Sequence, residues 1–407
     1  MMKNNQDLQG SNISVFVGIY NGSKYLESIK QQLLEQTAYD FPILVVDNFS
    51  TDDSWEKLQS WSKTFGSRIS IIRNDSNLGA GGSLKKAIDA GLISTKWFTA
   101  FHQDDLYLPN HIAVLTEAIE NSEKNVVGIC TSMGSIDNNG NTVSTPPRAS
   151  WLVSNESQVD SFLINLRTQT LSWPSTAFRT EEFSRCFNYV HSPSFSDTET
   201  TLRLCAYGEF RYLRKETMRY RENPQSESHV VNSLESTVGA ALGIVRVIAS
   251  DEFRKICGMV SEKQEEFFLE LMSSIGVRLG ESILCEFVRI LAIEECARTW
   301  NFKGIESSKS LAKVYSTLRS EFTSTLISSQ IGIENPEPDA KLEQRLKELV
   351  GISSINLLTA TPSRSNSHRL ARTISRLPLG MKIPLFKVFV RVRAVKNPNH
   401  YWNAYWR

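Results

Sequence analysis

The sequence predicts an α/β fold, with a mainly parallel sheet and flanking helices, followed by a C-terminal helical region and a basic tail. Three observations predict it. Short apolar runs rich in β-branched residues alternate with helical patterns over residues 13–130, at the spacing of right-handed βαβ units. Helical spacing without strand alternation then dominates residues 234–360. Residues 361–407 hold ten Lys or Arg and no Asp or Glu.

The predicted strands are continuous apolar runs, as expected of strands buried on both faces of a sheet. They are Ile13–Ile19, Phe41–Asp47, Ile69–Ile72, Trp97–Phe101 and Val126–Cys130. Between them lie apolar residues at helical spacing. Ser50 or Asp52 can cap the second of these helices, and Gly91 stops the third. Trp173–Phe178 is predicted to return to the sheet.

The stretch Trp97–Pro109, WFTAFHQDDLYLP, places two acids directly after a predicted strand. Ligands of parallel sheets bind beyond the carboxyl ends of the strands. Asp104 and Asp105 can hold a divalent cation there and, through it, a diphosphate. The alternative for an isolated acid pair is a solvated turn. Asp47 ends another strand at the same edge, and this second acid weakens that alternative.

A further acid lies in the segment FSDTETTLRLCAYGEF, residues 195–210. Ser196 and Glu199 fit a capping box, which places Asp197 in the first turn of a helix that Gly208 ends. On these residues alone, Asp197 is explained as an acid that the helix dipole stabilises.

The later parts of the chain suggest three domains: 1–233, 234–360 and 361–407. The helices of 234–360 fit packing or acceptor recognition. In the tail, basic residues accompany Tyr401, Trp402, Tyr405 and Trp406. That mixture suits an anionic membrane surface, contacted through residues 376–407. A basic edge strand with an aromatic docking helix explains it equally well. No nucleic-acid-binding motif accompanies the charge, so we expect no nucleic-acid partner.

Composition and motifs exclude several classes of protein. The six cysteines form no C-x-x-C pair, which favours a reducing compartment. The polar N-terminus lacks a signal-peptide core, and no stretch spans a bilayer. We therefore expect a cytoplasmic protein, with peripheral attachment to the inner face of the cell membrane as an open alternative. The glycine-rich loop at 79–82 is no dinucleotide fingerprint, because its third glycine would fall at Leu84. No P-loop is present.

Several segments between residues 12 and 230 resemble the family 2 glycosyltransferases of the GT-A fold. The similarity is strongest to rhamnosyltransferase-like members of bacterial surface-polysaccharide clusters. The segments are ISVFVGIYNGSKYLESIKQQLLEQT, VVDNFSTDDS, RNDSNLGAGGSLKKAIDAG, FHQDDLYLP, SDTETTLRLCAYGEFRYL and YRENPQSES. Each motif is weak alone, whereas their shared order and spacing are specific.

The resemblance implies an inverting glycosyltransferase of the hexosyltransferase class. It would move a sugar from a nucleotide-sugar donor to a glycan or lipid-linked acceptor in O-antigen or capsule biosynthesis. It implies Asp197 as the catalytic base and Mg²⁺ or Mn²⁺ as the cofactor. The implied donor-binding residues are Tyr20, Asp47, Asn48, Asp52 and Asp104. The implied metal ligands are Asp104, Asp105 and His102.

Three departures from the family pattern bear on activity. His102 stands where the family's first metal-motif Asp usually lies. Ser196 replaces the Glu of the E-D pair, and Asn223 replaces the His of Y-R-x-H. They leave open the alternative of a non-catalytic GT-A-like binding or scaffold subunit at the membrane.

Overall fold

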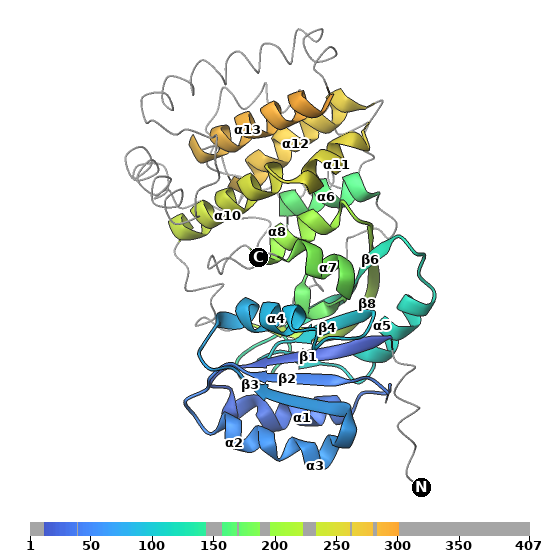
Figure 1. Cartoon of the computed structure of the whole chain (residues 1–407), viewed down its shortest axis with the longest axis vertical. Helices are drawn as coiled ribbons and strands as arrows, with labels where there is room; N and C mark the ends of the chain where they lie inside the picture. The colour runs from blue at the N-terminus through green and yellow to red at the C-terminus, as the bar shows by residue number, and fades with distance from the viewer. Residues whose placement is uncertain are drawn as a thin grey trace. The chain divides into compact units, whose positions relative to one another are not determined.

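The computed structural model of the chain divides into two compact units (Figure 1). The first comprises residues 1–161 and 169–230, and the second comprises 162–168 and 231–407. The structure describes residues 12–38, 40–143, 157–168, 171–187, 196–222, 233–260, 263–279 and 283–300. The predicted basic tail, 361–407, lies outside these described residues, as does 301–360 of the predicted helical domain.

The first unit is built on an eight-stranded sheet with the order β3-β2-β1-β4-β7-β6-β8-β5. The strands are β1 Ile13–Ile19, β2 Ile43–Asp47, β3 Ile69–Arg73, β4 Trp97–Phe101, β5 Leu106–Tyr107, β6 Val126–Ile136, β7 Thr176–Arg179 and β8 Glu209–Arg221. β3, β2, β1 and β4 are parallel neighbours, and β6 runs parallel to β8. The remaining pairs are antiparallel. The mainly parallel α/β sheet predicted from the sequence is confirmed.

Helices flank this sheet on both faces. They are α1 Leu26–Leu34, α2 Ser54–Gln59, α3 Trp61–Phe65, α4 Gly79–Asp89, α5 His111–Glu120, α7 Thr180–Cys186 and α8 Ser196–Leu204. In Figure 1, α1, α2 and α3 lie below strands β1–β3, and α4 lies above them. Gly91 ends the α4 segment with a φ of 65°, a left-handed conformation that favours glycine.

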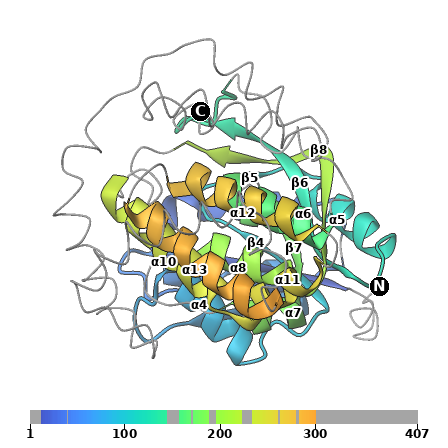
Figure 2. The ribbon, with the colours of Figure 1, turned by 90° about the horizontal axis from the view of Figure 1, so that it is seen from above.

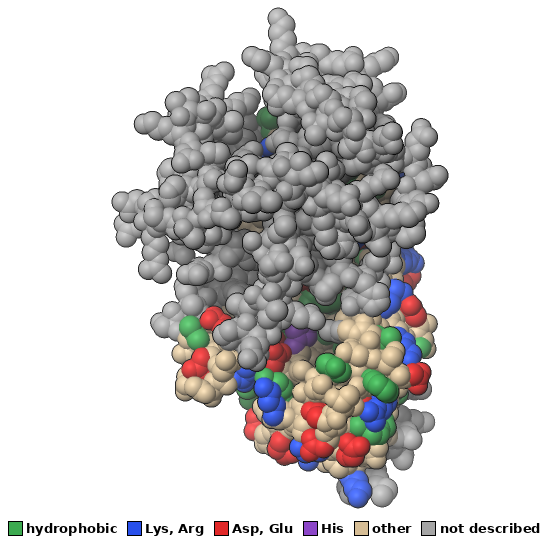
Figure 3. Space-filling model, turned by 90° about the vertical axis from the view of Figure 1, so that its left-hand side faces the viewer, with side chains coloured by type: hydrophobic (Ala, Val, Ile, Leu, Met, Phe, Trp, Pro, Cys, Tyr) green, Lys and Arg blue, Asp and Glu red, His purple; other side chains and the backbone are tan. Residues whose placement is uncertain are grey.

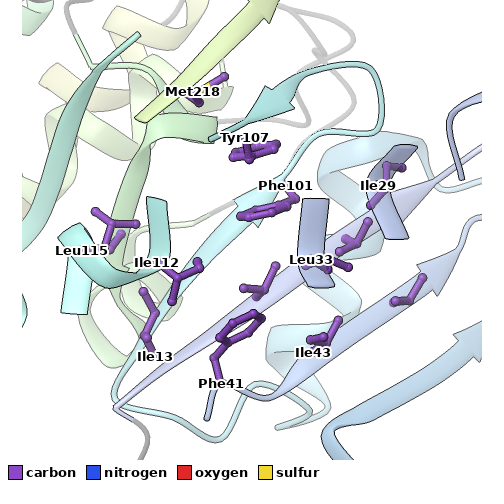
Figure 4. Close-up of a cluster of buried hydrophobic side chains, with 14 of the residues drawn as sticks. Ile13, Ile29, Leu33, Phe41, Ile43, Phe101, Tyr107, Ile112, Leu115 and Met218 are labelled. Atoms are coloured by element: carbon purple, nitrogen blue, oxygen red, sulfur yellow. The ribbon is translucent and has the colours of Figure 1, made fainter. Parts of the chain in front are cut away.

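The core of the first unit lies between the sheet and the helices α1, α3 and α5 (Figure 4). The alternate strand residues Ile13, Val15 and Val17 face it, and they are at most 2% exposed. Phe101 of β4 stacks on Tyr107, with ring centroids 3.6 Å apart and an interplanar angle of 3°. This buried stack lies directly beneath the segment in which the sequence predicts a metal site.

The structure differs from the sequence-based expectation in the second half of the sheet. The expected strand Val126–Cys130 extends to Ile136 and pairs with β8, a strand that we did not predict. Helix α8 ends at Leu204 rather than at Gly208. Gly208 instead permits a close approach of two backbones, because a Cβ there would lie 2.1 Å from the carbonyl oxygen of Asn125.

The second unit is helical over its described residues (Figure 2). Its helices are α10 Ser233–Ile248, α11 Asp251–Gly258, α12 Gln264–Leu279 and α13 Ile283–Trp300, together with the last part of α6, Gln158–Thr168. Arg167 of α6 pairs with Glu270 of α12 and donates to the hydroxyl of Ser274 at 3.2 Å. None of the helices that the structure describes is long and apolar enough to cross a membrane.

Candidate functional site

Three loops meet at the carboxyl edge of the parallel strands. They follow β1 (the 20–22 loop), β2 (the 48–53 loop) and β4 (the 102–105 turn). The register brings them together, because Ile19 is paired with Asp47 and Val17 is paired with Phe101. The five predicted donor-binding residues and the three predicted metal ligands all lie on these loops or at the strand ends beside them. Asp104 belongs to both sets, so these are seven residues: Tyr20, Asp47, Asn48, Asp52, His102, Asp104 and Asp105.

Asp52 ties the 48–53 loop to the start of two helical turns. One carboxylate oxygen accepts from the N–H of Ser54 at 3.0 Å, and the other accepts from the N–H of Ser23 at 3.1 Å. Burial acts to raise the pKa of Asp52, but these hydrogen bonds outweigh it and lower that pKa below the ordinary value. The N-cap residue of α2 is Asp53, which makes no side-chain capping bond, so the predicted cap at Ser50 or Asp52 is wrong, although Asp52 does accept from the first N–H of the helix.

Asp47 is fully buried, and its charge is matched by an arginine. Its Oδ2 lies 3.1 Å from Nε of Arg73 and accepts from the N–H of Ser50 at 3.3 Å. Its Oδ1 has no hydrogen-bond partner within the described residues. A buried acceptor without a partner is costly. This oxygen is therefore suited to an N–H donor of a bound molecule.

The side chain of Asn48 forms hydrogen bonds with the loop that precedes α4. Its amide donates to Asn77 at 2.7 Å, and its carbonyl oxygen accepts from Asn74 and from the N–H of Leu78. Beside it, the Phe49 side chain is 45% exposed at a φ of 65°, and Tyr20 is 41% exposed. Exposed aromatic rings next to the buried Asp47 provide stacking surfaces for a planar ligand.

The 102–105 turn is held by contacts from three distant segments. The phenol of Tyr107 accepts from the N–H of His102 at 2.8 Å. Arg221, the last residue of β8, donates its backbone N–H to Oδ1 of Asp105 at 2.9 Å and its Nε to the carbonyl of Asp104 at 2.7 Å. The side-chain amide of Gln103 bonds the backbone of Tyr20. These contacts hold the backbone of the turn together.

Two side chains of this turn remain available to a ligand. Asp104 is half-buried, and its carboxylate makes no hydrogen bond within the described residues. The side chain of His102 is 46% exposed, and its Nδ1 lies 3.9 Å from Oδ2 of Asp105. Desolvation lowers the pKa of His102, and the charge of Asp104 opposes this shift. In Figure 3 a histidine (purple) reaches the surface next to an acidic side chain; His111, by contrast, is buried.

These residues fit a divalent cation that takes some of its ligands from elsewhere. Carboxylate oxygens suit Mg²⁺ and Mn²⁺, and a neutral imidazole suits Mn²⁺. Over the part of the chain that the structure describes, no group of three or more acidic, His or Cys side chains is arranged to enclose an ion. Mg²⁺ commonly binds through one or two carboxylates together with waters and phosphate oxygens, so an open set of this kind is sufficient.

Asp197 lies in the first turn of α8, as the sequence predicts, and is half-buried. Its Oδ1 accepts from the N–H of Thr198 at 2.7 Å. Glu199, one turn on, is 2% exposed and pairs with Arg203 at 3.0 Å. The pairing of Glu199 leaves Asp197 as the carboxylate of this turn that lies nearer to solvent. Asn223 lies outside the described residues.

Sequence reasoning missed the residues that hold these carboxylates in place. Arg73, Gln103, Tyr107 and Arg221 were not singled out. Arg73 is the last residue of β3, so its position at the carboxyl edge was available from the strand pattern. The alternation of Phe210 and Tyr212 is the signal that would have revealed β8 and its terminal Arg221.

Comparison with known proteins gives a consistent family for this region. Residues 14–185 match the family model described as glycosyl transferase family 2. An uncharacterised glycosyltransferase of Haemophilus influenzae is 32% identical over 123 residues, which are 30% of this chain and 36% of that protein. The glycosyltransferase GlyG of Streptococcus pneumoniae is 29% identical over 115 residues, which are 28% of this chain and 37% of that protein. The chain thus spans about a third of the length of these relatives.

Solved structures with a similar arrangement include residues 1–349 of Staphylococcus aureus TarS in complex with UDP-GlcNAc. The identity is 14%, the coverage is 72% of this chain and 91% of that chain, and the TM-score is 0.48. The mannosyltransferase PcManGT of Pyrobaculum calidifontis, in complex with GDP-Man and Mn²⁺, is 14% identical with a TM-score of 0.43, covering 85% of this chain and 88% of that chain.

Proposed function

Because residues 14–185 match glycosyltransferase family 2 and form a GT-A-like fold, we propose that this protein is an inverting glycosyltransferase. It transfers a sugar, of the hexosyl class, from a nucleotide-sugar donor to a glycan or lipid-linked acceptor. The observation that carries the proposal is that two carboxylates with different surroundings lie at the same edge of the sheet. Asp47 is buried with one unpartnered oxygen, and Asp104 is half-buried without a side-chain hydrogen bond in the described residues.

In the proposed complex, the nucleoside lies against the first two loops. Oδ1 of Asp47 accepts an N–H of the nucleobase, and the exposed ring of Tyr20 offers it a stacking surface. Asn48 and Asp52 contribute to donor binding indirectly, because their side chains form hydrogen bonds that hold the loops in place.

Asp104, Asp105 and His102 would hold Mg²⁺ or Mn²⁺ at the 102–105 turn. The ion, when bound, neutralises charge that develops on the leaving nucleoside diphosphate. Asp105 is already oriented by the N–H of Arg221, so its second oxygen faces the His102 side of the turn.

Asp197 is the proposed catalytic base. Its carboxylate removes the proton of the acceptor hydroxyl as the hydroxyl oxygen attacks the anomeric carbon of the donor. The bond from that carbon to the diphosphate oxygen breaks on the opposite face, and the diphosphate leaves with the bonding electrons. A single displacement of this kind inverts the anomeric configuration.

A direct test is the release of nucleoside diphosphate from a panel of nucleotide sugars, with and without Mn²⁺ or Mg²⁺. Asp104→Asn should lower turnover on the order of 10³-fold, because a ligand of the ion is lost. Asp197→Asn should lower it about 10²–10⁴-fold without weakening donor binding. The matched control is Asp89→Asn, which removes an exposed acid of α4 paired with Lys85 in its own helix.

Binding of a donor that is independent of metal and unchanged by Asp104→Asn would overturn the assignment of the ion. Donor binding without turnover for every acceptor offered would favour the alternative, a non-catalytic GT-A-like binding or scaffold subunit.

We also propose a cellular setting for this activity. In this proposal the protein acts in bacterial surface-polysaccharide biosynthesis at the cytoplasmic face of the membrane, and the support is the resemblance of its motifs to those of rhamnosyltransferase-like proteins. Residues 376–407 would contact anionic lipid headgroups through their basic and aromatic side chains. Deleting 376–407 should abolish cosedimentation with anionic liposomes and leave the background with neutral liposomes unchanged. Equal cosedimentation of the full and shortened chains would contradict the lipid contact.

A further inference from the structure

Gln103 joins two loops that the proposed function assigns to different parts of the donor. Its Oε1 accepts from the N–H of Tyr20 at 3.0 Å, and its Nε2 donates to the carbonyl of Tyr20 at 3.2 Å. The side-chain amide of Gln103 thus both accepts from and donates to the backbone of Tyr20, as the backbone of a neighbouring strand would. Backbone pairing between β1 and β4 ends at Val17 and Phe101, so this contact continues the pairing into the loops.

Gly22 provides independent support for this contact. A Cβ at Gly22 would lie 2.5 Å from Oε1 of Gln103 and 3.2 Å from its Cδ, so any larger residue would displace the amide. The N–H of Gly22 is held by the hydroxyl of Ser54 at 3.1 Å, and this bond fixes the loop from its other side. The 20–22 loop is therefore shaped around the Gln103 side chain.

The neighbours of Gln103 are held equally firmly. The N–H of His102 donates to Tyr107, and the carbonyl of Asp104 accepts from Arg221. The turn consequently moves as one piece, and Gln103 is its link to Tyr20. Both polar groups of the Gln103 amide are used in that link.

We infer that Gln103 is a positioning residue that couples the nucleoside-binding 20–22 loop to the metal-binding 102–105 turn. Because the turn moves as one piece, a ligand that shifts either segment shifts the other through the paired amide, so nucleoside and metal bind cooperatively without touching one another. Such coupling is reciprocal: a nucleoside that tightens Mn²⁺ binding is itself bound more tightly when Mn²⁺ is present. The inference rests on the proposed function, which places both ligands at this edge.

The test uses ligands that cannot meet directly. A nucleoside carries no phosphate, the group through which a nucleotide binds the ion, so an effect of it on Mn²⁺ binding passes through the protein once direct nucleoside–Mn²⁺ binding, measured without protein, has been subtracted. The nucleosides uridine, thymidine and guanosine are each added at saturation, and the Kd of Mn²⁺ is measured by electron paramagnetic resonance. In the wild-type chain, at least one nucleoside should lower the Kd of Mn²⁺ about fivefold or more.

Gln103→Met keeps the length of the side chain and removes both hydrogen bonds. It should bring the ratio of the two Kd values, without and with nucleoside, to about one. Gly22→Ala should do the same by displacing the amide. The matched control is Gln31→Met, because Gln31 is an exposed glutamine of α1 bonded only to Glu35 in its own helix. That variant should retain the wild-type ratio.

The failures are distinguishable. An undiminished ratio in Gln103→Met would overturn the inference and leave the proposed function intact. If the wild-type chain binds both nucleoside and Mn²⁺ but the Kd of Mn²⁺ is the same without and with nucleoside, the inference is likewise overturned and the proposed function stays intact. If the wild-type chain binds neither ligand, the proposed function falls, and the coupling falls with it.

Discussion

Asp47 ends β2 and Asp104 lies in the turn after β4, at the same edge of the sheet, yet their surroundings are opposite. Asp47 is fully buried, and the side chain of its partner Arg73 is 33% exposed. Asp104 is half-buried, and no cation of the described residues pairs with it. One carboxylate is therefore neutralised by the protein itself, whereas the other keeps its charge available.

This difference assigns the two acids different partners. A buried carboxylate that already has an arginine gains little from a second cation, but its unpartnered oxygen gains from a neutral N–H donor. A carboxylate without a cation is the better ligand for a divalent ion. Two acids that look alike in the sequence are thus separated by what lies next to them.

The largest expected effect is that two matched variants each weaken the binding of a different ligand. Asp104→Asn should raise the Kd of Mn²⁺ on the order of 100-fold and leave nucleoside binding unchanged, because only the ion loses a ligand. Asp47→Asn should weaken nucleoside binding and leave the Kd of Mn²⁺ unchanged. Isothermal titration of each ligand alone measures both. Equal losses of both ligands in both variants would break the comparison.

Removing the support beneath the turn should have a smaller effect. The Tyr107 phenol accepts from the N–H of His102 and donates to the carbonyl of Ala100 at 3.1 Å, while its ring is held by Phe101. Tyr107→Phe keeps the ring and leaves these groups unpaired, so we expect a loss of about 1–2 kcal/mol in the free energy of unfolding. The Kd of Mn²⁺ should rise about tenfold.

Urea unfolding and Mn²⁺ titration measure these two changes. Tyr212→Phe is the control, because it removes the phenol of another buried tyrosine, on β8. A loss of stability with unaltered Mn²⁺ affinity would show that the phenol supports the core and has no influence on the turn.

The last expected effect concerns pH and changes stability without changing a ligand of the site. His111 is buried against Phe101 and Tyr107, its Nδ1 is 2.7 Å from the hydroxyl of Thr217, and burial lowers its pKa to about 3. Between pH 6.5 and about 3, the unfolded chain binds a proton at this histidine that the folded chain does not. Stability is therefore fully present above pH 6.5 and falls as the pH is lowered, by up to about 1.4 kcal/mol per pH unit from this group.

The comparison of wild type with His111→Gln isolates this contribution, since glutamine does not titrate and can still bond Thr217. Urea unfolding at pH 7 and at pH 5 should show a steeper loss in the wild type. Parallel losses in the two proteins would mean that His111 is protonated in the folded chain.

The amino-acid sequence by itself determined the strands on which the site is built. β1, β2, β3 and β4 are continuous apolar runs, and their burial on both faces follows from local composition. The position of Asp47 and of the 102–105 turn at the carboxyl edge follows from the order of strands and helices. Asp197 was likewise placed in a first helical turn, which the structure confirms.

Only the tertiary structure decided how these acids are supported. Arg73 of β3 pairs with Asp47 of the neighbouring strand β2. Arg221 contacts Asp105, which lies 116 residues earlier in the chain, and Gln103 contacts Tyr20, which lies 83 residues earlier. Local patterns report which residues are buried or capped. Pairing between side chains distant in sequence depends on strand order and register, which the complete sheet sets. The pairing with an arginine that separates Asp47 from Asp104 is therefore a property of the fold.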